Sequence, residues 1–386
     1  MTWRPPVVLL LAFAVTLAAC GGGGDADPTP TSTRRATRTP TATASPTRTA
    51  TPTFTSTPVP ALTPTPRPAG SGQPNGPNQP SGGQPPRQTA GLSLPGGFGA
   101  SVVAEGLYRP TSVAVAPDGT VYVSERHGPV YRLTSGGRTR VATFSGDVTG
   151  IAVSPGGELY VSSTGRVSVV RGGGAQTIIS GLPHGRHQNN GIAFAGGKMY
   201  VTNGSTCDDC VEANARSATI LQANLDGSGL RVYARGLRNP YDLVFDSSGQ
   251  LWATDNGSDT PCGTSDELNR IVDGGDYGWP YRPQCDSFHD GIAPVANLGL
   301  HTASTGIDYY DGAQFPGSYR GDLFLTLWGS LFAPPELAPA LYHVRGSSAQ
   351  RFASGFSNPI DVAMDRDGSL LVLDYGSGRL FRIRYG

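Results

Sequence analysis

Lysine is nearly missing from this chain of 386 residues, in which Lys198 is the only one. Residues 91–386 carry 22 basic and 27 acidic residues, a formal net charge of −5. A mildly acidic region lacks the concentrated positive charge with which proteins bind nucleic acids. We therefore expect no nucleic-acid partner.

Several chemical motifs are also absent. The chain contains no dinucleotide-binding fingerprint, which argues against a nicotinamide cofactor. Besides Cys207-Asp-Asp-Cys210 there is no second Cys-x-x-Cys and no His-x-x-x-His, so a zinc site would lack two ligands. Long amphipathic helical periodicity is missing as well, and the folded region is therefore expected to be all-β.

The first 20 residues have the features of an export signal. Arg4 precedes an apolar run, Val7–Leu17, that is too short to span a bilayer as a mature helix. The run ends in Leu-Ala-Ala-Cys20, which resembles the lipobox of bacterial lipoproteins; an ordinary secretory signal is the alternative. We expect acylated Cys20 to be the only membrane anchor and the protein to lie outside the cytoplasm, in the cell envelope.

Residues 21–90 are predicted to form a disordered tether. Of these 70 residues, 31 are Pro or Thr, and Phe54 is the only aromatic residue. Such a segment has too little apolar surface to offset the chain entropy lost on folding, and spaced prolines favour extended conformations. Residues 91–386 are therefore the expected folded domain.

A hairpin pattern recurs through residues 91–386. A glycine-containing approach, an alternating apolar strand, a glycine turn and a second alternating strand begin near Gly106, Gly146, Asn189, Gly236, Ser304 and Gly355. Six copies at a spacing of about 50 residues predict a six-bladed β-propeller. A strand at Ala100–Ala104 beside Leu380–Arg384 of the last copy would close the ring.

Oxygen-bearing residues crowd the segment after the fourth hairpin: Asp255, Asn256, Asp259, Thr260, Thr264, Asp266 and Glu267. Oxygen ligands in such number suit Ca²⁺, although Asp266 and Glu267 could equally cap the following turn. Upstream, Arg238 precedes Asn239-Pro240 at the start of an inner strand. A buried guanidinium there could bind an anionic or carbonyl-rich ligand, or could tie loop carbonyls together.

Another candidate is His187, which lies directly before the innermost strand of the third copy. That position would direct it to the central channel, where a histidine can serve as a base near neutral pH. A surface or packing histidine is the alternative.

Four cysteines remain besides Cys20, and they allow three disulfide connectivities. An exported chain favours disulfide formation. We expect the pairs Cys207–Cys210 and Cys262–Cys285, because each pair lies within one loop system.

The segment from Ser217 to Tyr281 resembles the pyrroloquinoline quinone (PQQ)-dependent sugar dehydrogenases. The resemblance is strongest to the sorbosone dehydrogenase-like branch, alongside soluble glucose dehydrogenase. The resemblance covers nearly all of residues 91–386. Its most specific parts are GLRNP (236–240), TDNG (254–257), DELN (266–269) and DYGWPY (276–281).

The resemblance implies a six-bladed propeller that holds PQQ and Ca²⁺ over its channel. His187 would match the general base, and Arg238 the arginine beside the reactive quinone carbonyl. Asn239 and Asn256 would be neighbouring cofactor contacts. Gly257 and Ser258 would match the residues whose backbone carbonyls bind the cofactor's Ca²⁺.

This chain departs from the family pattern at three places. Trp328-Gly-Ser-Leu-Phe-Ala333 stands in the fifth blade where the sorbosone-type branch has His-Gly-Ser-Trp-Asn-Arg. Asn190 replaces the arginine usual three residues after the histidine, and Asn358 and Ile360 replace last-blade arginines of soluble glucose dehydrogenase. We therefore expect a site with fewer cations to meet the carboxylates of PQQ.

The sequence thus predicts a PQQ- and Ca²⁺-dependent dehydrogenase that oxidises an aldose or related sugar to the lactone or acid. Its electrons would pass to a quinone or a cytochrome. Two alternatives are a Ca²⁺-dependent lactonase-like hydrolase and a non-catalytic propeller that binds glycans or proteins.

Overall fold

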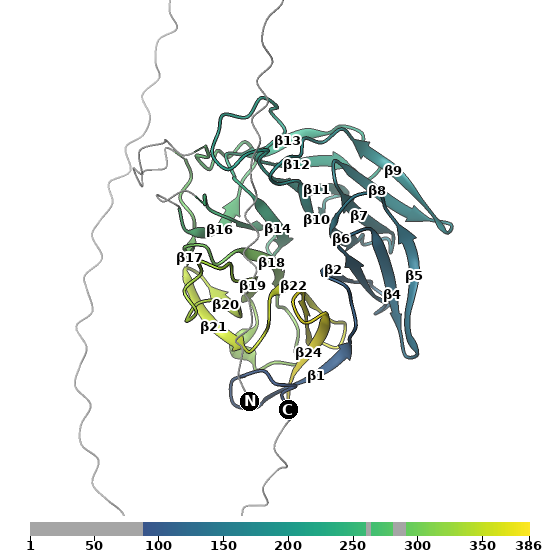
Figure 1. Ribbon diagram of the computed structural model, residues 1–386, viewed down its shortest axis with the longest axis vertical. Helices are drawn as coiled ribbons and strands as arrows, with labels where there is room; N and C mark the ends of the chain where they lie inside the picture. The colour runs from purple at the N-terminus through teal and green to yellow at the C-terminus, as the bar shows by residue number, and fades with distance from the viewer. Residues whose placement is uncertain (1–87, 260–263, 281–290) are drawn as a thin grey trace, which may run out of the picture. The chain divides into compact units, whose positions relative to one another are not determined.

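The computed structural model describes residues 88–259, 264–280 and 291–386. The predicted signal segment, Cys20, nearly all of the predicted tether, Cys262 and Cys285 lie outside these residues. Within them, 24 strands form six four-stranded sheets arranged as blades around a central channel (Figure 1). The prediction of an all-β, six-bladed propeller is confirmed.

Each blade contributes one strand to each of four concentric layers. The innermost strands are β2 (Pro110–Val115), β6 (Val148–Val153), β10 (Asn189–Ala195), β14 (Pro240–Phe245), β18 (Ser304–Tyr309) and β22 (Pro359–Met364). The second strands are β3 (Val121–Glu125), β7 (Leu159–Ser163), β11 (Lys198–Asn203), β15 (Leu251–Asp255), β19 (Leu323–Leu327) and β23 (Leu370–Asp374). These two layers correspond to the six hairpins read from the sequence.

The outer layers complete the sheets. The third strands are β4 (Pro129–Thr134), β8 (Arg166–Arg171), β12 (Thr219–Asn224), β16 (Asp266–Ile271), β20 (Ala340–Arg345) and β24 (Arg379–Tyr385). The outermost strands are β5 (Gly137–Thr143), β9 (Gly174–Ser180), β13 (Arg231–Arg235), β17 (Ala296–Gly299), β21 (Ser348–Ser354) and β1 (Phe98–Ala104). The described residues contain one helical turn, η1 (Gly317–Tyr319), and no helix long and apolar enough to cross a bilayer.

The predicted register of the first hairpin is observed. Val113 pairs with Val123 and Val115 with Val121. Gly119 has φ of +87° in the connecting turn, and glycine adopts this left-handed conformation without the steric cost that a side chain brings. The alternating sequence therefore places one face of each strand against the neighbouring blade.

The ring closes through strands from opposite ends of the folded domain. β1 pairs antiparallel with β24, from Phe98 opposite Tyr385 to Ala104 opposite Leu380 (Figure 1). Phe98 also packs edge-on against Phe315 and Phe352 of the fifth blade, with ring centroids 4.8 and 4.9 Å apart. The closure predicted from the sequence is confirmed.

Side-chain hydrogen bonds tie successive inner strands together near their N-terminal ends. Thr111 donates to the carbonyl of Val148 (2.8 Å), and Thr149 to that of Asn189 (2.7 Å). We call this end of the channel the upper mouth and the C-terminal end of the inner strands the lower mouth. Because the bonds link blades directly, they fix the relative positions of residues that reach the upper mouth from different blades.

Candidate functional site

A cavity of about 400 Å³ opens at the upper mouth. It is bordered by residues at or near the N-terminal ends of all six inner strands, among them Thr111, Thr149, Asn190, Tyr241, Thr305 and Ile360. The predicted site residues His187, Asn239 and Asn256 also line it. Its volume lies within the range of small-molecule sites in proteins.

His187 is placed by hydrogen bonds from the segment that follows β11. Its amide donates to the carbonyl of Ser205 (3.0 Å), and its Nδ1 lies 2.8 Å from the Ser205 hydroxyl. Gly204 permits this approach, because a Cβ there would lie 2.5 Å from the Cβ of His187 and 2.9 Å from Oδ1 of Asn239. The imidazole is therefore held at the cavity wall, as predicted.

The hydrogen-bond network around Ser205 determines the tautomer of His187. The single hydroxyl hydrogen of Ser205 is donated to the carbonyl of Cys207 (2.7 Å). Ser205 must therefore accept from Nδ1–H of His187, which leaves the lone pair on Nε2. A histidine in this form can take a proton from a ligand.

His187 remains neutral over a wide pH range. Burial, together with the nearby positive charges of Arg238 and Arg186, lowers the pKa of His187 to about 3. The imidazole therefore carries its acceptor lone pair throughout the neutral range.

Arg238 lies behind the cavity wall, with 2% of its surface exposed. Its Nε donates to the carbonyl of Asp208 (3.0 Å), Nη1 to the carbonyl of Asn256 (3.2 Å), and Nη2 pairs with the carboxylate of Asp208. The arginine thus ties loop carbonyls together, which was one of the two functions considered for it. One Nη1 hydrogen has no acceptor among the described residues.

Asn239 and Asn256 reach the cavity from the two ends of the β14–β15 hairpin. The amide of Asn239 donates to Oδ1 of Asp255 (2.7 Å), and Nδ2 of Asn256 donates to the carbonyl of Ser304 in the next blade (2.8 Å). Nδ2 of Asn190 lies 3.4 Å from Oδ1 of Asn239. The cavity wall is therefore rich in amide groups that can hydrogen-bond a polar ligand.

The buried carboxylates of the fourth blade support the loop instead of opening toward the cavity. Asp266 and Glu267 lie in β16, so the idea that they cap a turn is wrong. Asp266 accepts hydrogen bonds from the amides of Gly257 (2.8 Å) and Ala303 (2.5 Å). Burial raises the pKa of Asp255 and of Asp266, and raises that of Glu267 to about 7.

Gly257 and Ser258 are both buried after the end of β15. A Cβ on Gly257 would lie 2.0 Å from the carbonyl oxygen of Thr264, so only glycine fits there. The amide of Gly257 is engaged by Asp266, whereas its carbonyl accepts no hydrogen bond from the described residues. A buried carbonyl without a donor is a suitable ligand for a hard cation such as Ca²⁺.

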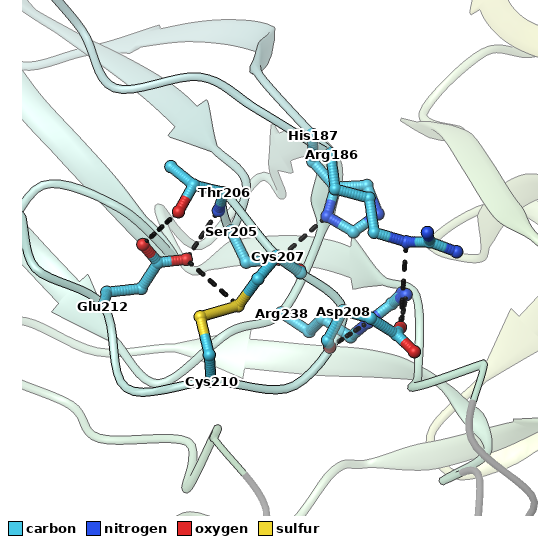
Figure 2. The surroundings of a disulfide bond; sticks show 9 residues. All are labelled: Arg186, His187, Ser205, Thr206, Cys207, Asp208, Cys210, Glu212 and Arg238. Atoms are coloured by element: carbon cyan, nitrogen blue, oxygen red, sulfur yellow. Dashed lines mark hydrogen bonds and ion pairs between the residues drawn. A yellow bond between two sulfur atoms is a disulfide. The ribbon is translucent and has the colours of Figure 1, made fainter. Parts of the chain in front are cut away.

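One of the two predicted disulfides is observed. Cys207 and Cys210 are bonded, with their Cα atoms 6.1 Å apart (Figure 2). Cys262 and Cys285 lie outside the described residues. The Cys207–Cys210 bond closes the short loop that contacts both Ser205 and Arg238.

Two arginines at the cavity were not anticipated from the sequence. Arg126, in the turn between β3 and β4, and Arg186 both line it. Nε of Arg126 lies 2.8 Å from Asp147, and Arg186 pairs with Asp259. The expectation of fewer cations compared only the positions at which the family has arginines. It therefore missed Arg126 and Arg186, which reach the cavity from other positions.

The departures in the fifth and sixth blades are located at the same mouth. Trp328 and Ile360 line the cavity, and Nδ2 of Asn358 donates to the carbonyl of Trp328 (3.0 Å). Leu331 and Phe332 are 98% and 80% exposed on the loop that follows. This part of the wall is thus apolar and aromatic where the family has charged side chains.

A sequence profile of the family described as Glucose / Sorbosone dehydrogenase matches residues 175–382. The chain belongs to this family. Its members are sugar oxidoreductases, and the matched segment contains His187, Arg238, Asn239 and Asn256.

Individual relatives of this glucose/sorbosone dehydrogenase family protein are distant. Quinoprotein glucose dehydrogenase B of Acinetobacter calcoaceticus is 39% identical over 72 residues, which are 16% of this chain and 14% of that protein. The PQQ-bound aldose sugar dehydrogenase of Streptomyces coelicolor superposes with a TM-score of 0.61 at 22% identity, over 76% of this chain and 100% of that one. The apo-form soluble aldose sugar dehydrogenase of Escherichia coli gives a TM-score of 0.61 at 19% identity, over 75% and 100%.

Proposed function

We propose that this member of the glucose/sorbosone dehydrogenase family is a PQQ- and Ca²⁺-dependent enzyme that oxidises an aldose or related sugar to the lactone or acid. The observation that carries the proposal is the position of His187, at the wall of a cavity lined by amides and arginines. Its imidazole is neutral, and its acceptor Nε2 makes no hydrogen bond with the described residues. This geometry supports His187 as the base that would remove the proton of a sugar hydroxyl.

The residues at the upper mouth fit both cofactors. Gly257 and Ser258 would hold Ca²⁺ through their backbone carbonyls, and the Gly257 carbonyl lacks a competing donor among the described residues. Asn239 and Asn256 would contact PQQ with their amides. Arg126 and Arg186 line the cavity and would meet PQQ carboxylates, in place of the arginines that the last blade lacks.

When bound, PQQ supplies the acceptor for the hydride that leaves the sugar carbon. His187 would take the hydroxyl proton of the same carbon on Nε2, while Ser205 keeps its Nδ1 protonated. Arg238 would place its positive charge where negative charge develops, and one of its Nη1 hydrogens has no acceptor among the described residues. The catalytic residues would therefore be His187 and Arg238.

The proposal includes a location and an electron acceptor. Acylated Cys20 would anchor the protein in the cell envelope, and residues 21–90 would separate the propeller from the membrane. Electrons would leave to a quinone or a cytochrome, because the chain has no dinucleotide fingerprint.

A cofactor-dependence experiment tests the function. The purified chain is incubated with PQQ and Ca²⁺, with PQQ and EDTA, or with Ca²⁺ alone, and dye reduction is followed over a panel of aldoses. We expect sugar-dependent reduction only with both cofactors. Binding of Ca²⁺ and of PQQ to the cofactor-free protein is measured in parallel by titration. Binding of Ca²⁺ without PQQ would favour a lactonase-like hydrolase, and binding of neither would favour a non-catalytic propeller.

A further inference from the structure

The loop closed by the Cys207–Cys210 disulfide contacts two side chains that have separate roles in the proposed reaction. Figure 2 shows the loop beside Arg238, Ser205 and His187. His187 belongs to the third blade and Arg238 precedes the fourth. A single short loop therefore contacts Arg238 directly and His187 through Ser205.

The contacts with Arg238 come from Asp208, the residue that follows Cys207. The Asp208 carbonyl accepts from Nε (3.0 Å), and its carboxylate pairs with Nη2. The carbonyl of Arg238 in turn accepts from the amide of Ser205 (2.8 Å). Burial acts against it, but the hydrogen bond from Arg238 lowers the pKa of Asp208, so the pair stays charged.

The contact with His187 runs through Ser205. Nδ1–H of His187 donates to the Ser205 hydroxyl (2.8 Å), which donates to the carbonyl of Cys207 (2.7 Å). The Cys207 carbonyl is thus the final acceptor of the chain that sets the tautomer. If that carbonyl turned away, the Ser205 hydroxyl could rotate and donate to Nδ1, which would place the proton on Nε2.

The loop is held in place by one disulfide bond and by polar contacts, because it has almost no apolar surface to bury. Val211 is 87% exposed. The Glu212 carboxylate accepts from the amide (2.5 Å) and the hydroxyl (2.6 Å) of Thr206, and the disulfide joins the two ends. These contacts hold the Cys207 carbonyl and Asp208 in place.

We propose that the disulfide-closed loop Cys207–Cys210 positions both functional side chains: Asp208 orients Arg238, and the Cys207 carbonyl, through Ser205, keeps His187 in the tautomer whose Nε2 accepts a proton. Asp208 and Ser205 are positioning residues. The effect of the loop on catalysis rests on the proposed function. Its effect on the His187 tautomer and on the hydrogen bonds of Arg238 can be measured without cofactor or sugar.

Asp208 is tested against its neighbour in the same loop. D208N removes the nearer of two carboxylates that pair with Arg238, the other being that of Asp259 at 3.4 Å. Asp209 makes no hydrogen bond with the residues that the structure describes, and D209N is the matched control. We expect kcat to fall about 10- to 100-fold in D208N with little change in KM, and D209N to stay within about twofold of wild type. In the cofactor-free protein, the Arg238 Nε–H resonance should exchange with water faster in D208N alone. Equal effects of the two substitutions would overturn this part.

Ser205 is tested against another buried serine. S205A removes the acceptor of Nδ1–H. S217A is its control, since the Ser217 hydroxyl is buried and has no hydrogen-bond partner within residues 88–259, 264–280 and 291–386. The readout is the ¹H–¹⁵N spectrum of histidine side chains in the cofactor-free protein, with His187 assigned by H187Q. We expect the Nδ1–H form in wild type and S217A, and a shift toward Nε2–H in S205A. An Nε2–H form in wild type would contradict the proposal.

The disulfide is tested with the double substitution C207S/C210S. We expect both changes together, a mixed His187 tautomer and faster exchange at Arg238, in a protein that keeps its β-sheet circular dichroism. Unchanged resonances would show that the loop does not need its cross-link to position either residue. If no sugar is oxidised but the resonances respond as expected, the proposed function fails and the positioning stands.

Discussion

The two mouths of the channel are built from the same six inner strands, and their charged side chains have different kinds of partner. At the upper mouth, charged side chains pair with each other around a cavity, as Arg126 does with Asp147 and Arg186 with Asp259. At the lower mouth, Asp242, Asp308 and Asp361 border a second cavity. Each lies on an inner strand and accepts an amide hydrogen from the inner strand of the next blade.

This difference indicates that the charged residues of the upper mouth are available to a ligand, whereas the aspartates of the lower mouth hold neighbouring blades together. The three aspartates bond to Ile307 (3.1 Å), Met364 (2.6 Å) and Val113 (2.7 Å), so their oxygens link blades. Burial raises the pKa of Asp242 to about 7 and that of Asp308 to about 6, and it raises that of Asp361 as well. An acidic cluster is thus no sign of a ligand where each carboxylate already has a structural partner.

The comparison predicts that substitutions at the upper mouth reduce activity, and the largest reduction is expected at His187. H187Q removes the base, and kcat should fall about 10²- to 10⁴-fold with the fold intact. H184Q is the matched control, because His184 is exposed in the same segment. Steady-state kinetics with PQQ and Ca²⁺ measure the change, and wild-type kcat in H187Q would remove His187 from the reaction.

The pH dependence of the wild-type enzyme follows from the same residue. Its low pKa keeps His187 neutral, so activity should be retained as the pH falls from 8 to 5 and decline only as the pH approaches about 3. The kcat profile of the PQQ-loaded enzyme measures this. An acidic limb near the usual histidine pKa of about 6.5 would show that the imidazole is more exposed than the structure places it.

A smaller effect is expected at Arg126. R126Q removes one cation from the cavity, and PQQ should bind about 10- to 100-fold more weakly, since a charge-assisted hydrogen bond contributes about 1.5–3 kcal/mol. Titration of the cofactor-free protein with PQQ measures the Kd. R132Q is the control, because Arg132 is exposed on β4. Equal Kd values for the two variants would leave the PQQ carboxylates to other residues.

The smallest effect is expected at the lower mouth. A carboxyl group whose folded-state pKa is raised contributes stability below its unfolded pKa and loses it as the pH rises through the folded value. The unfolding free energy should therefore fall between about pH 4 and 7. In D308N the total fall over this range should be smaller by about 1 kcal/mol, a modest amount because Asp308 is only partly buried. Urea unfolding at several pH values measures the slope, and kcat of D308N should match wild type.

The hairpins, their register and the ring closure could be predicted from the sequence, because alternation and glycine turns are local signals. Val113 opposite Val123 and the β1–β24 pair are examples. The positions of His187 and Asn239 at the cavity were also predictable, since each precedes an inner strand. Arg238 also precedes an inner strand, but it is buried and does not line the cavity. To predict these features, it is enough to know which strand each residue lies in or next to.

Other parts of the site depend on how distant turns meet. Arg126 follows β3 and reaches the cavity only because the ring brings the first blade to the same mouth as the third and fourth. The role of Asp208 was hidden because Cys-x-x-Cys indicates a disulfide but not what the enclosed residues contact. Asp266 and Glu267 were uncertain because strand β16 follows a long loop without an obvious boundary.

The pairing of β1 with β24 also determines when, during synthesis of the chain, the propeller can close. The strand that completes the last blade is synthesised before all the other strands of the domain, whereas its partner β24 is synthesised after all of them. Until Arg379–Tyr385 has been synthesised, β1 is an edge strand with unpaired amides and carbonyls, and the earlier blades form an open arc. The upper mouth, which needs all six inner strands, can therefore exist only after β22 has been made.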